Sequence, residues 1–291
     1  MKEYSKVAVI GLGTMGLPIA LNLSKKSISI QVWNRSEPSR VIALANGIQV
    51  IEKLTDIDAQ IFLTVLPDIA QLNEVLKNGL QTALRPGDIL VVMGTVSPRA
   101  VRALGARLEP LGIHVVDAPV SGGDVGAQQG TLSIMVGADP EDFKILLPIL
   151  EAIGAVVRLM GPLGSGQVAK ACNQIVVATT LSAIGEAVTL ARKAGLDVAT
   201  LFEILAGGLA NSRALEVKGD RILYGNFTPG GTSANQLKDL KIALETSADS
   251  GVCVPVTERV AELFASMIAS GDGALDHSAI IREIERMSAQ K

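Results

Sequence analysis

The sequence predicts an α/β fold in which a doubly wound, mostly parallel sheet is followed by an all-α domain, with a long helix joining the two. Short β-branched runs alternate with helical patterns as far as residue 159, and helical patterns alone follow. Alternating strands and helices are typical of parallel sheets covered by helices. The run Ser165–Lys193 lacks proline and would extend ~40 Å as a helix, enough to join two domains.

Length and composition fit two folded domains. The 291 residues are 48% apolar and 19% charged, with a net charge of −3, so a large core is expected and disorder is not. Acidic and basic residues are interspersed, which argues against the basic face that nucleic-acid binding needs. We expect no signal peptide and no apolar run long enough to span a membrane, and therefore a soluble cytoplasmic protein.

The cysteines and histidines do not have the spacing of a metal site. Cys172 and Cys253 are far apart in the chain, and His114 and His277 are isolated. Both cysteines lie in apolar helical patterns, so we expect them to be small core residues. We predict neither a metal site nor a disulfide.

A glycine-rich turn follows the first predicted strand. The expected order is strand 6–10, turn Gly11-Leu-Gly-Thr-Met-Gly16, helix 17–26 and strand 28–33. This is the order of a Rossmann-type dinucleotide-binding unit. Gly11 permits the tight turn, Gly13 lets a pyrophosphate approach the backbone, and Gly16 lets the helix pack on the strand. The N–H groups at the helix start favour phosphates.

The end of the second strand indicates which cofactor is preferred. An acidic residue there would bind the adenosine ribose and repel a 2′-phosphate, but this chain has Asn34-Arg35-Ser36. Arg35 can pair with a phosphate, Asn34 is uncharged, and Ser36 offers a hydroxyl. We therefore expect NADP to be preferred over NAD, with NAD possible. The alternative is that Arg35 is a solvated surface charge.

The alternation continues through the first half of the chain. We expect helices at 36–46, 98–111 and 140–153, and strands at 48–51, 60–66, 88–93, 113–117, 132–136 and 155–159. Asp68 is expected to cap a further helix. Ligands of such sheets bind outside the carboxyl ends of the strands, so residues at these ends should converge on one crevice. They are Gly11, Pro67, Thr95 and Pro119.

A glycine-rich segment, residues 117–132, lies between two of these strands, and we expect it to form neither helix nor strand. Ser121, Gly122 and Gly123 can turn successive backbone N–H groups toward one point and form an anion-binding nest. A small carboxylate would suit such a nest. The alternative is a flexible surface loop.

The long predicted helix carries the candidate chemistry. Lys170, Asn173 and Gln174 share one of its faces at spacings of three and four. Hydride transfer to a carbonyl leaves negative charge on oxygen, and a buried lysine can supply the proton that this oxygen needs. Asn173 can hold a substrate hydroxyl or carboxylate. The alternative is a lysine exposed beyond the buried stripe of the helix.

The remaining helices are expected near 197–206, 212–219, 235–250, 255–270 and 277–287. Asp197 and Asp276 are expected N-caps. A helix as long and apolar as 165–193 often packs against a partner subunit, so we expect a homodimer or homotetramer.

Taken in order, these motifs resemble those of the β-hydroxyacid dehydrogenase family along the whole chain. The turn at 11–16, Asp117-Ala-Pro-Val-Ser-Gly-Gly123 and Gly164-Ser-Gly-Gln-Val-Ala-Lys170 are similar to its cofactor, substrate and catalytic motifs. The resemblance implies that Lys170 is the general acid/base and that residues 121–123 hold the substrate carboxylate. It also implies that Thr95 contacts the nicotinamide side, that Lys238 reaches the cofactor, and that Phe227 is the aromatic often found before that helix.

The chain departs from many members of this family after the lysine. Many carry asparagine four residues later, where this chain has Gln174, with Asn173 at plus three. This pattern, like residues 207–212 and 275–279, is similar to the tartronate semialdehyde reductase branch. The histidine that usually precedes the Lys-Asp-Leu segment is replaced by Asn235-Gln-Leu.

We therefore expect residues 1–163 to bind NAD(P), and residues 164–291 to form a helical substrate and dimerisation domain. The expected activity is NADP-preferring reduction of 2-hydroxy-3-oxopropionate to glycerate. One alternative is 3-hydroxyisobutyrate or another short semialdehyde in the same site, and another is a non-catalytic dinucleotide-binding interaction module. An imine reductase is disfavoured, because those relatives generally replace the lysine. The expected site residues are Lys170 and Asn173 for catalysis; Ser121, Gly122, Gly123 and Gln174 for substrate; and Gly11, Leu12, Gly13, Thr14, Met15, Gly16, Asn34, Arg35, Ser36, Leu66, Pro67, Thr95, Phe227 and Lys238 for cofactor.

Overall fold

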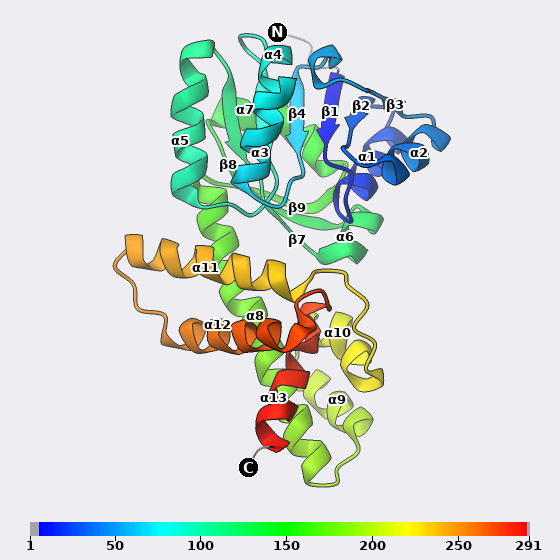
Figure 1. Ribbon diagram of the computed structural model, residues 1–291, viewed down its shortest axis with the longest axis vertical. Coiled ribbons are helices and arrows are strands. Elements are labelled where there is room, and N and C mark those ends of the chain that lie inside the picture. Colours follow the sequence, from blue (N-terminus) through cyan, green and yellow to red (C-terminus); the bar gives the residue numbers. More distant parts are fainter. Residues whose placement is uncertain (1–5, 290–291) are drawn as a thin grey trace. The chain divides into compact units, whose positions relative to one another are not determined.

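The computed structural model describes residues 6–289, which form two compact units that divide after Lys170 (Figure 1). The predicted outer limits of the two domains, residues 1 and 291, lie outside this part. The first unit is a sheet with helices and the second is helical, so the predicted fold class is confirmed. Helix α8 (Ser165–Lys193) begins in the first unit and continues into the second. The predicted limit between residues 163 and 164 falls just before this helix, whereas the compact units divide within it.

The sheet of the first unit has the order β3-β2-β1-β4-β5-β6-β8-β7, with β9 paired to β8. The strands are β1 (Lys6–Ile10), β2 (Ser29–Trp33), β3 (Gln49–Val50), β4 (Ile61–Thr64), β5 (Ile89–Val92), β6 (His114–Asp117), β7 (Val120–Ser121), β8 (Leu132–Gly137) and β9 (Gly154–Gly161). Strands β1 to β6 are parallel, whereas β8 is antiparallel to β6 and β7. Chain order reverses at β1, which lies between β2 and β4. Ligand crevices of open parallel sheets form at such a switch point.

The helices of the first unit begin where the sequence offers N-terminal signals. They are α1 (Gly16–Lys25), α2 (Glu37–Ala45), α3 (Ile69–Val75), α4 (Gln81–Ala83), α5 (Pro98–Leu108), α6 (Gly123–Gln129) and α7 (Pro140–Glu151), with short 3₁₀ or π segments η1 (Leu54–Asp56), η2 (Leu76–Leu80) and η3 (Glu109–Leu111). The predicted cap Asp68 accepts a 2.8 Å hydrogen bond from the Gln71 N–H. Proline occupies the first turns of α5 and α7, where its missing N–H has no cost.

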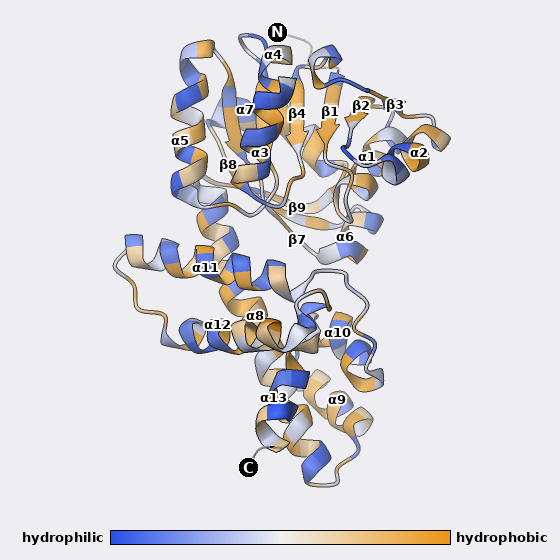
Figure 2. Cartoon of the chain, in the orientation of Figure 1, coloured by the Kyte–Doolittle hydropathy of each residue, from blue (hydrophilic) through white to orange (hydrophobic). Residues whose placement is uncertain are grey.

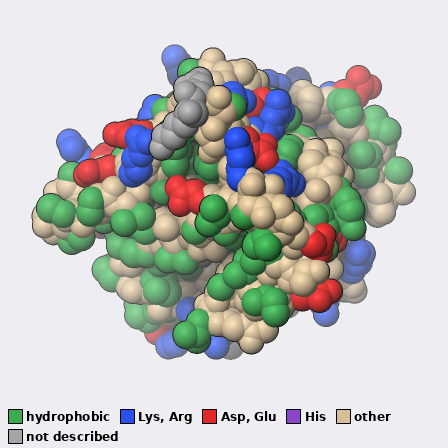
Figure 3. All heavy atoms as spheres, turned by 90° about the horizontal axis from the view of Figure 1, so that it is seen from below, with side chains coloured by type: hydrophobic (Ala, Val, Ile, Leu, Met, Phe, Trp, Pro, Cys, Tyr) green, Lys and Arg blue, Asp and Glu red, His purple; other side chains and the backbone are tan. Residues whose placement is uncertain are grey.

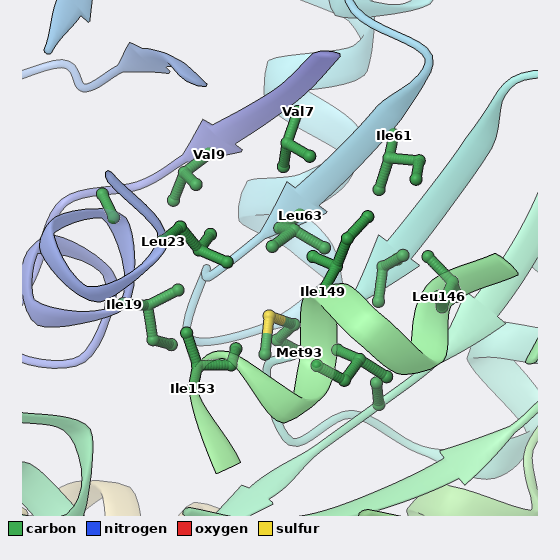
Figure 4. Close-up of a cluster of buried hydrophobic side chains, with 14 of the residues drawn as sticks. Val7, Val9, Ile19, Leu23, Ile61, Leu63, Met93, Leu146, Ile149 and Ile153 are labelled. Carbon is green, nitrogen blue, oxygen red and sulfur yellow. The ribbon is translucent and has the colours of Figure 1, made fainter. Parts of the chain in front are cut away.

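Two apolar layers, one on each face of the sheet, form the core of the first unit. Along β1, Val7 and Val9 belong to one layer, and Ala8 and Ile10 to the other. The first layer packs against α1 and α7, and its labelled members in Figure 4 are Val7, Val9, Ile19, Leu23, Ile61, Leu63, Met93, Leu146, Ile149 and Ile153. Figure 2 shows the resulting pattern, in which the central strands β1 and β4 are mostly hydrophobic and the helices are mixed. Strands buried on both faces explain the continuous apolar runs of the sequence.

The second unit contains only helices among the described residues. After α8 they are α9 (Val198–Ala206), α10 (Arg213–Tyr224), α11 (Ser233–Asp249), α12 (Pro255–Met267), η4 (Ile268–Asp272), η5 (His277–Ala279) and α13 (Ile280–Ala289). The expected N-cap Asp197 accepts from the Thr200 N–H at 2.7 Å. Helix α10 continues past the predicted end at Gly219, because Gly225, with φ 67°, ends it instead.

Asp276 is a buried junction within the second unit. It caps η5 as predicted, accepting from the Ser278 N–H at 3.1 Å and the Ser278 hydroxyl at 2.7 Å. Its carboxylate also accepts from Lys218 Nζ at 2.8 Å and from the Gly230 N–H at 3.1 Å. Burial alone would raise the pKa of Asp276, but the nearby His277 and Lys218 charges and the Ser278 hydrogen bond hold it well below its usual range.

The prediction that residues 117–132 contain neither helix nor strand is wrong. Strand β7 and helix α6 lie within this segment. Three of the four glycines lie at the ends of α6, and the fourth, Gly126, lies inside the helix. Gly122 and Gly123 turn the chain with φ 129° and 63°, and Gly130, with φ 67°, ends the helix. Between them, residues 124–129 are compatible with a helix.

The prediction that both cysteines are core residues is also wrong, since Cys172 and Cys253 are exposed. Helix α8 carries alanine and valine on all sides, so the sequence does not reveal which face is exposed. The same composition makes α8 long and apolar enough to cross a membrane, contrary to the prediction that no such run exists. Half of the most apolar stretch of α8 is buried inside the protein. One such helix is weak evidence of a membrane, because core helices of soluble proteins share these properties.

Candidate active site

Backbone-to-backbone packing brings three turns together at the carboxyl edge of the sheet. A Cβ placed on Gly11, after β1, would lie 2.6 Å from the Val65 carbonyl oxygen. A Cβ placed on Gly94, after β5, would lie 1.9 Å from the Leu66 carbonyl oxygen. Only glycine allows these approaches, so the turns that follow β1, β4 and β5 lie against one another. Among the predicted cofactor residues, Leu66 belongs to one of these turns and Thr95 follows Gly94 in another.

The three glycines of the turn at 11–16 have different surroundings. Gly11 has φ 95°, and a Cβ on Gly16 would lie 1.8 Å from the Gly11 carbonyl oxygen, so folding itself requires both. Around a Cβ placed on Gly13, no atom of the described chain lies within 4 Å. Gly13 therefore faces open space at the start of α1. Within residues 6–289 no side chain caps this helix start, so its N–H groups suit an anion, and the turn fits a dinucleotide phosphate.

Asn34 organises the region beside this turn. Its Oδ1 accepts from the Leu12 N–H at 2.9 Å, and its Nδ2 donates to the Ser36 hydroxyl at 2.9 Å. The side chain of Arg35 is 80% exposed, and its Nη1 lies 4.0 Å from Glu74 Oε1. An exposed pair at that distance is weak, so the guanidinium can turn toward another anion.

The segment that includes Ser121, Gly122 and Gly123 leads from β7 into α6. Ser121 is half-buried, and both glycines are exposed. Asn22 of α1 donates from Nδ2 to the Ala127 carbonyl oxygen at 2.8 Å, which ties α6 to the helix that follows the glycine turn. The first unit thus contains both the glycine turn and the candidate carboxylate nest.

The start of α8 is held by Asp117 and Gln167, both fully buried. Asp117, at the end of β6, accepts from the N–H groups of Gly164 at 2.6 Å and Gln167 at 2.7 Å. Gln167 accepts from the Val96 N–H at 3.0 Å and donates to the Gly94 carbonyl oxygen at 2.9 Å. We call Asp117 and Gln167, with these four hydrogen bonds, the helix-start clamp. Burial raises the pKa of Asp117 to about 6, although the backbone hydrogen bonds oppose the shift.

Neither member of the helix-start clamp was among the predicted site residues. The available signal was modest: both stand inside the motifs quoted for substrate and lysine, and Asp117 ends an apolar strand. Lys170 lies one turn beyond Gln167 on α8 and is buried, with a relative exposure of 7%. This burial excludes the alternative of an exposed lysine.

The second unit holds the remaining predicted site residues. Gln174 is buried and donates from Nε2 to Asp239 Oδ2 at 2.6 Å. Lys238 Nζ lies 3.0 Å from Oδ1 of the same carboxylate. Asp239, which sequence reasoning missed, thus links two predicted residues. Asn173 is half-buried, and Phe227 packs against both apolar clusters of this unit.

The glycine turn at the switch point of a parallel sheet defines a dinucleotide-binding protein. Comparison with known families agrees: residues 6–161 match the NAD binding domain of 6-phosphogluconate dehydrogenase, and residues 164–284 match a domain described as NAD-binding of NADP-dependent 3-hydroxyisobutyrate dehydrogenase. The chain belongs to the β-hydroxyacid dehydrogenase family and is an NAD(P)-dependent oxidoreductase.

Known relatives match along nearly the whole chain. It is 38% identical to 2-hydroxy-3-oxopropionate reductase of Escherichia coli (strain K12) over 290 residues, covering 98% of this chain and 99% of that protein. It is 34% identical to 2-(hydroxymethyl)glutarate dehydrogenase of Eubacterium barkeri over 293 residues, covering 99% and 97%. The crystal structure of 3-hydroxyisobutyrate dehydrogenase from Salmonella typhimurium aligns with a TM-score of 0.89 at 26% identity, covering 95% of this chain and 99% of that one.

Proposed function

We propose that this enzyme reduces a small semialdehyde that carries a carboxylate, preferring NADPH, with 2-hydroxy-3-oxopropionate as substrate and glycerate as product. The observation that carries the proposal is the burial of Lys170 near the start of α8. One turn earlier, the Gln167 side chain is hydrogen-bonded to Gly94 and Val96, the two residues that flank Thr95. Lysine is among the residues least often buried, and a buried titratable side chain beside a cofactor crevice is typical of a catalytic site. The 38% identity to a reductase of this substrate supports the choice.

The proposed cofactor site uses the carboxyl edge of the sheet. Bound NADPH supplies the hydride. Open space at Gly13 allows the pyrophosphate to approach the helix start, and the exposed guanidinium of Arg35 can pair with the 2′-phosphate. Asn34 and Ser36 shape that end of the site. The further cofactor residues of the proposal are Leu12, Thr14, Met15, Leu66, Pro67, Thr95, Phe227 and Lys238.

The proposed chemistry needs a carboxylate anchor and a proton donor. Backbone N–H groups of residues 121–123 bind the substrate carboxylate. Lys170 gives its proton to the carbonyl oxygen as that oxygen becomes an alkoxide, and recovers a proton from solvent afterwards. Asn173 orients the substrate hydroxyl. Gln174 engages Asp239 through its Nε2, so its amide oxygen is the atom offered to the substrate.

Replacing the proposed general acid tests this assignment. Lys170→Ala should retain NADPH binding and lose turnover by about 10²–10⁴-fold. Lys193→Ala, which removes an exposed lysine from the same helix, is the matched control and should keep turnover. Near-normal turnover by Lys170→Ala would refute the assignment.

A second substrate is favoured by the match of residues 164–284 to the domain named for NADP-dependent 3-hydroxyisobutyrate dehydrogenase. The two substrates are separated by measuring NADPH oxidation with 2-hydroxy-3-oxopropionate and with the semialdehyde of 3-hydroxyisobutyrate. We expect a higher kcat/KM for the first. The reverse ranking would replace the proposed substrate by the second.

We also infer that the enzyme is soluble, cytoplasmic and a homodimer or homotetramer associated through α8. Exposed small or apolar residues recur along one side of this helix at Cys172, Val176, Ala183 and Leu190. The last three are seven apart, the spacing of a helix–helix seam. Figure 3 shows further hydrophobic side chains on one face of the protein. A light-scattering mass equal to one chain would remove this inference, and Leu190→Asp should lower the mass of an oligomer.

A further inference from the structure

We propose that Asp117 and Gln167 are positioning residues, which hold the first turn of α8 so that Lys170 is aimed at the reacting carbonyl. The inference rests on the proposed function, because it gives Lys170 its task. It adds that the position of the lysine is set by two buried side chains that do not themselves contact the substrate.

The Asp117 carboxylate holds α8 to β6. Each of its oxygens accepts one N–H of the helix start, from Gly164 at 2.6 Å and from Gln167 at 2.7 Å. The capping group therefore comes from a strand nearly fifty residues earlier instead of from the residue that precedes the helix. Such a cap fixes the helix relative to the sheet, and a local cap would fix only the helix itself.

Two glycines make this junction rigid. A Cβ on Gly137 would lie 2.2 Å from Asp117 Oδ1, and a Cβ on Gly166 would lie 2.3 Å from the Met135 carbonyl oxygen. The backbone of the helix start thus rests directly on the backbone of β8. No flexible side chain lies between them to absorb a displacement.

Gln167 transfers the same constraint to the turn that carries Thr95. Its Oε1 accepts from the residue after Thr95, Val96, and its Nε2 donates to the residue before, Gly94. Lys170 is three residues beyond Gln167, and side chains at this spacing share a helix face. Gln167 therefore fixes the positions of Lys170 and Thr95 relative to each other.

This arrangement matters for proton transfer. A general acid must come within hydrogen-bonding reach of the atom it protonates, and a misplacement of about 1 Å can reduce the rate about 10²-fold. Protonating Asp117 would turn one of its two acceptor oxygens into a donor, which breaks one bond of the helix-start clamp. Burial raises the pKa of this group to about 6, while Arg102 of α5 lowers it. Turnover should therefore fall on an acid limb near pH 6.

The test compares three variants of the full-length enzyme. Asp117→Asn and Gln167→Met remove clamp bonds at nearly constant volume. Asp88→Asn is the matched control, because Asp88 is a buried carboxylate of the same unit that accepts from the Arg85 N–H at 2.8 Å just before β5, far from the carboxyl edge. We expect kcat to fall about 10–100-fold in both clamp variants with an unchanged KM for NADPH, and to remain normal in the control. The acid limb near pH 6 should disappear in Asp117→Asn.

Hydrogen exchange separates failure of this inference from failure of the proposed function. The amides of residues 164–170 should exchange faster in both clamp variants than in wild type or Asp88→Asn, whatever the substrate. If the wild-type enzyme turns over no semialdehyde, the proposed function fails. If amide exchange at residues 164–170 is also unchanged in the clamp variants, the inference that Asp117 and Gln167 hold the helix start fails as well. Normal kcat in folded Gln167→Met, or an equal loss in Asp88→Asn, would overturn the positioning role. Gln167→Met removes no charge, so this variant still tests the positioning role if Asp117→Asn does not fold.

Discussion

A single methyl group at Gly13 should separate cofactor binding from folding. In Gly13→Ala the added Cβ enters space that contains no atom of the described chain within 4 Å, and the backbone is outside the left-handed region. Alanine should fit without strain. Because alanine restricts the unfolded chain more than glycine does, the free energy of unfolding should stay equal or rise by about 0.4–1 kcal/mol.

The same methyl group would stand where the pyrophosphate approaches the backbone. Each charge-assisted hydrogen bond between a backbone N–H and a phosphate contributes about 1.5–3 kcal/mol. Losing one such bond should raise the Kd for NADPH about 10- to 150-fold, since 1.4 kcal/mol corresponds to a factor of ten. The expected variant is folded, as stable as wild type and poor at binding.

Gly16→Ala is the matched control, because its methyl group meets backbone instead of open space. The added Cβ would lie 1.8 Å from the Gly11 carbonyl oxygen, and such overpacking costs about 1–3 kcal/mol. Urea unfolding and fluorescence titration with NADPH measure the two effects separately. Wild-type affinity in Gly13→Ala would refute the phosphate approach at this glycine, and wild-type stability in Gly16→Ala would refute the packing argument.

Three further perturbations follow from the charged groups. Because burial raises the pKa of Asp117 from 3.8 to about 6, proton uptake stabilises the fold below pH 3.8, and this contribution of about 3 kcal/mol is lost as the pH rises through 6. The difference in unfolding free energy between wild type and Asp117→Asn should therefore decrease from pH 4 to pH 7; a constant difference would contradict this. Lys218→Met should destabilise the protein by about 3 kcal/mol at pH 7, because it leaves Asp276 without its nearest cation. The loss should be smaller at low pH, where the Asp276 carboxylate can take up a proton. Equal losses of unfolding free energy at pH 4 and pH 7, measured by urea unfolding, would argue against this prediction. Arg35→Ala should reduce the ratio of kcat/KM for NADPH to that for NADH by about 10–100-fold, and an unchanged ratio would exclude contact with the 2′-phosphate.

Local patterns predicted much of the fold. The helix Ser165–Lys193 was expected with both of its observed ends, because Ser165 follows a glycine-proline turn and the helical pattern then continues without proline. Strand β1 and the cap at Asp68 were likewise expected, since each depends on neighbours within a few residues.

Features that depend on distant residues were not predicted. The helix-start clamp joins Asp117 to residues 47 and 50 positions later, and Gln174 finds Asp239 65 positions away. No periodicity of the sequence encodes such pairings. Helix α6 was missed for another reason. A segment with several glycines has the composition of an irregular loop, whether the glycines end a helix or belong to such a loop. Only the backbone dihedral angles distinguish the two.

The buried carboxylate of Asp276 has a consequence for the order of folding. It joins Lys218, 58 residues away, to the start of η5. Closing so long a loop is entropically unfavourable, so this ion pair should form after the folding transition state. Substitutions at Lys218 would then act mainly by speeding unfolding, with little effect on the folding rate. This pair would thus govern the kinetic lifetime of the second unit.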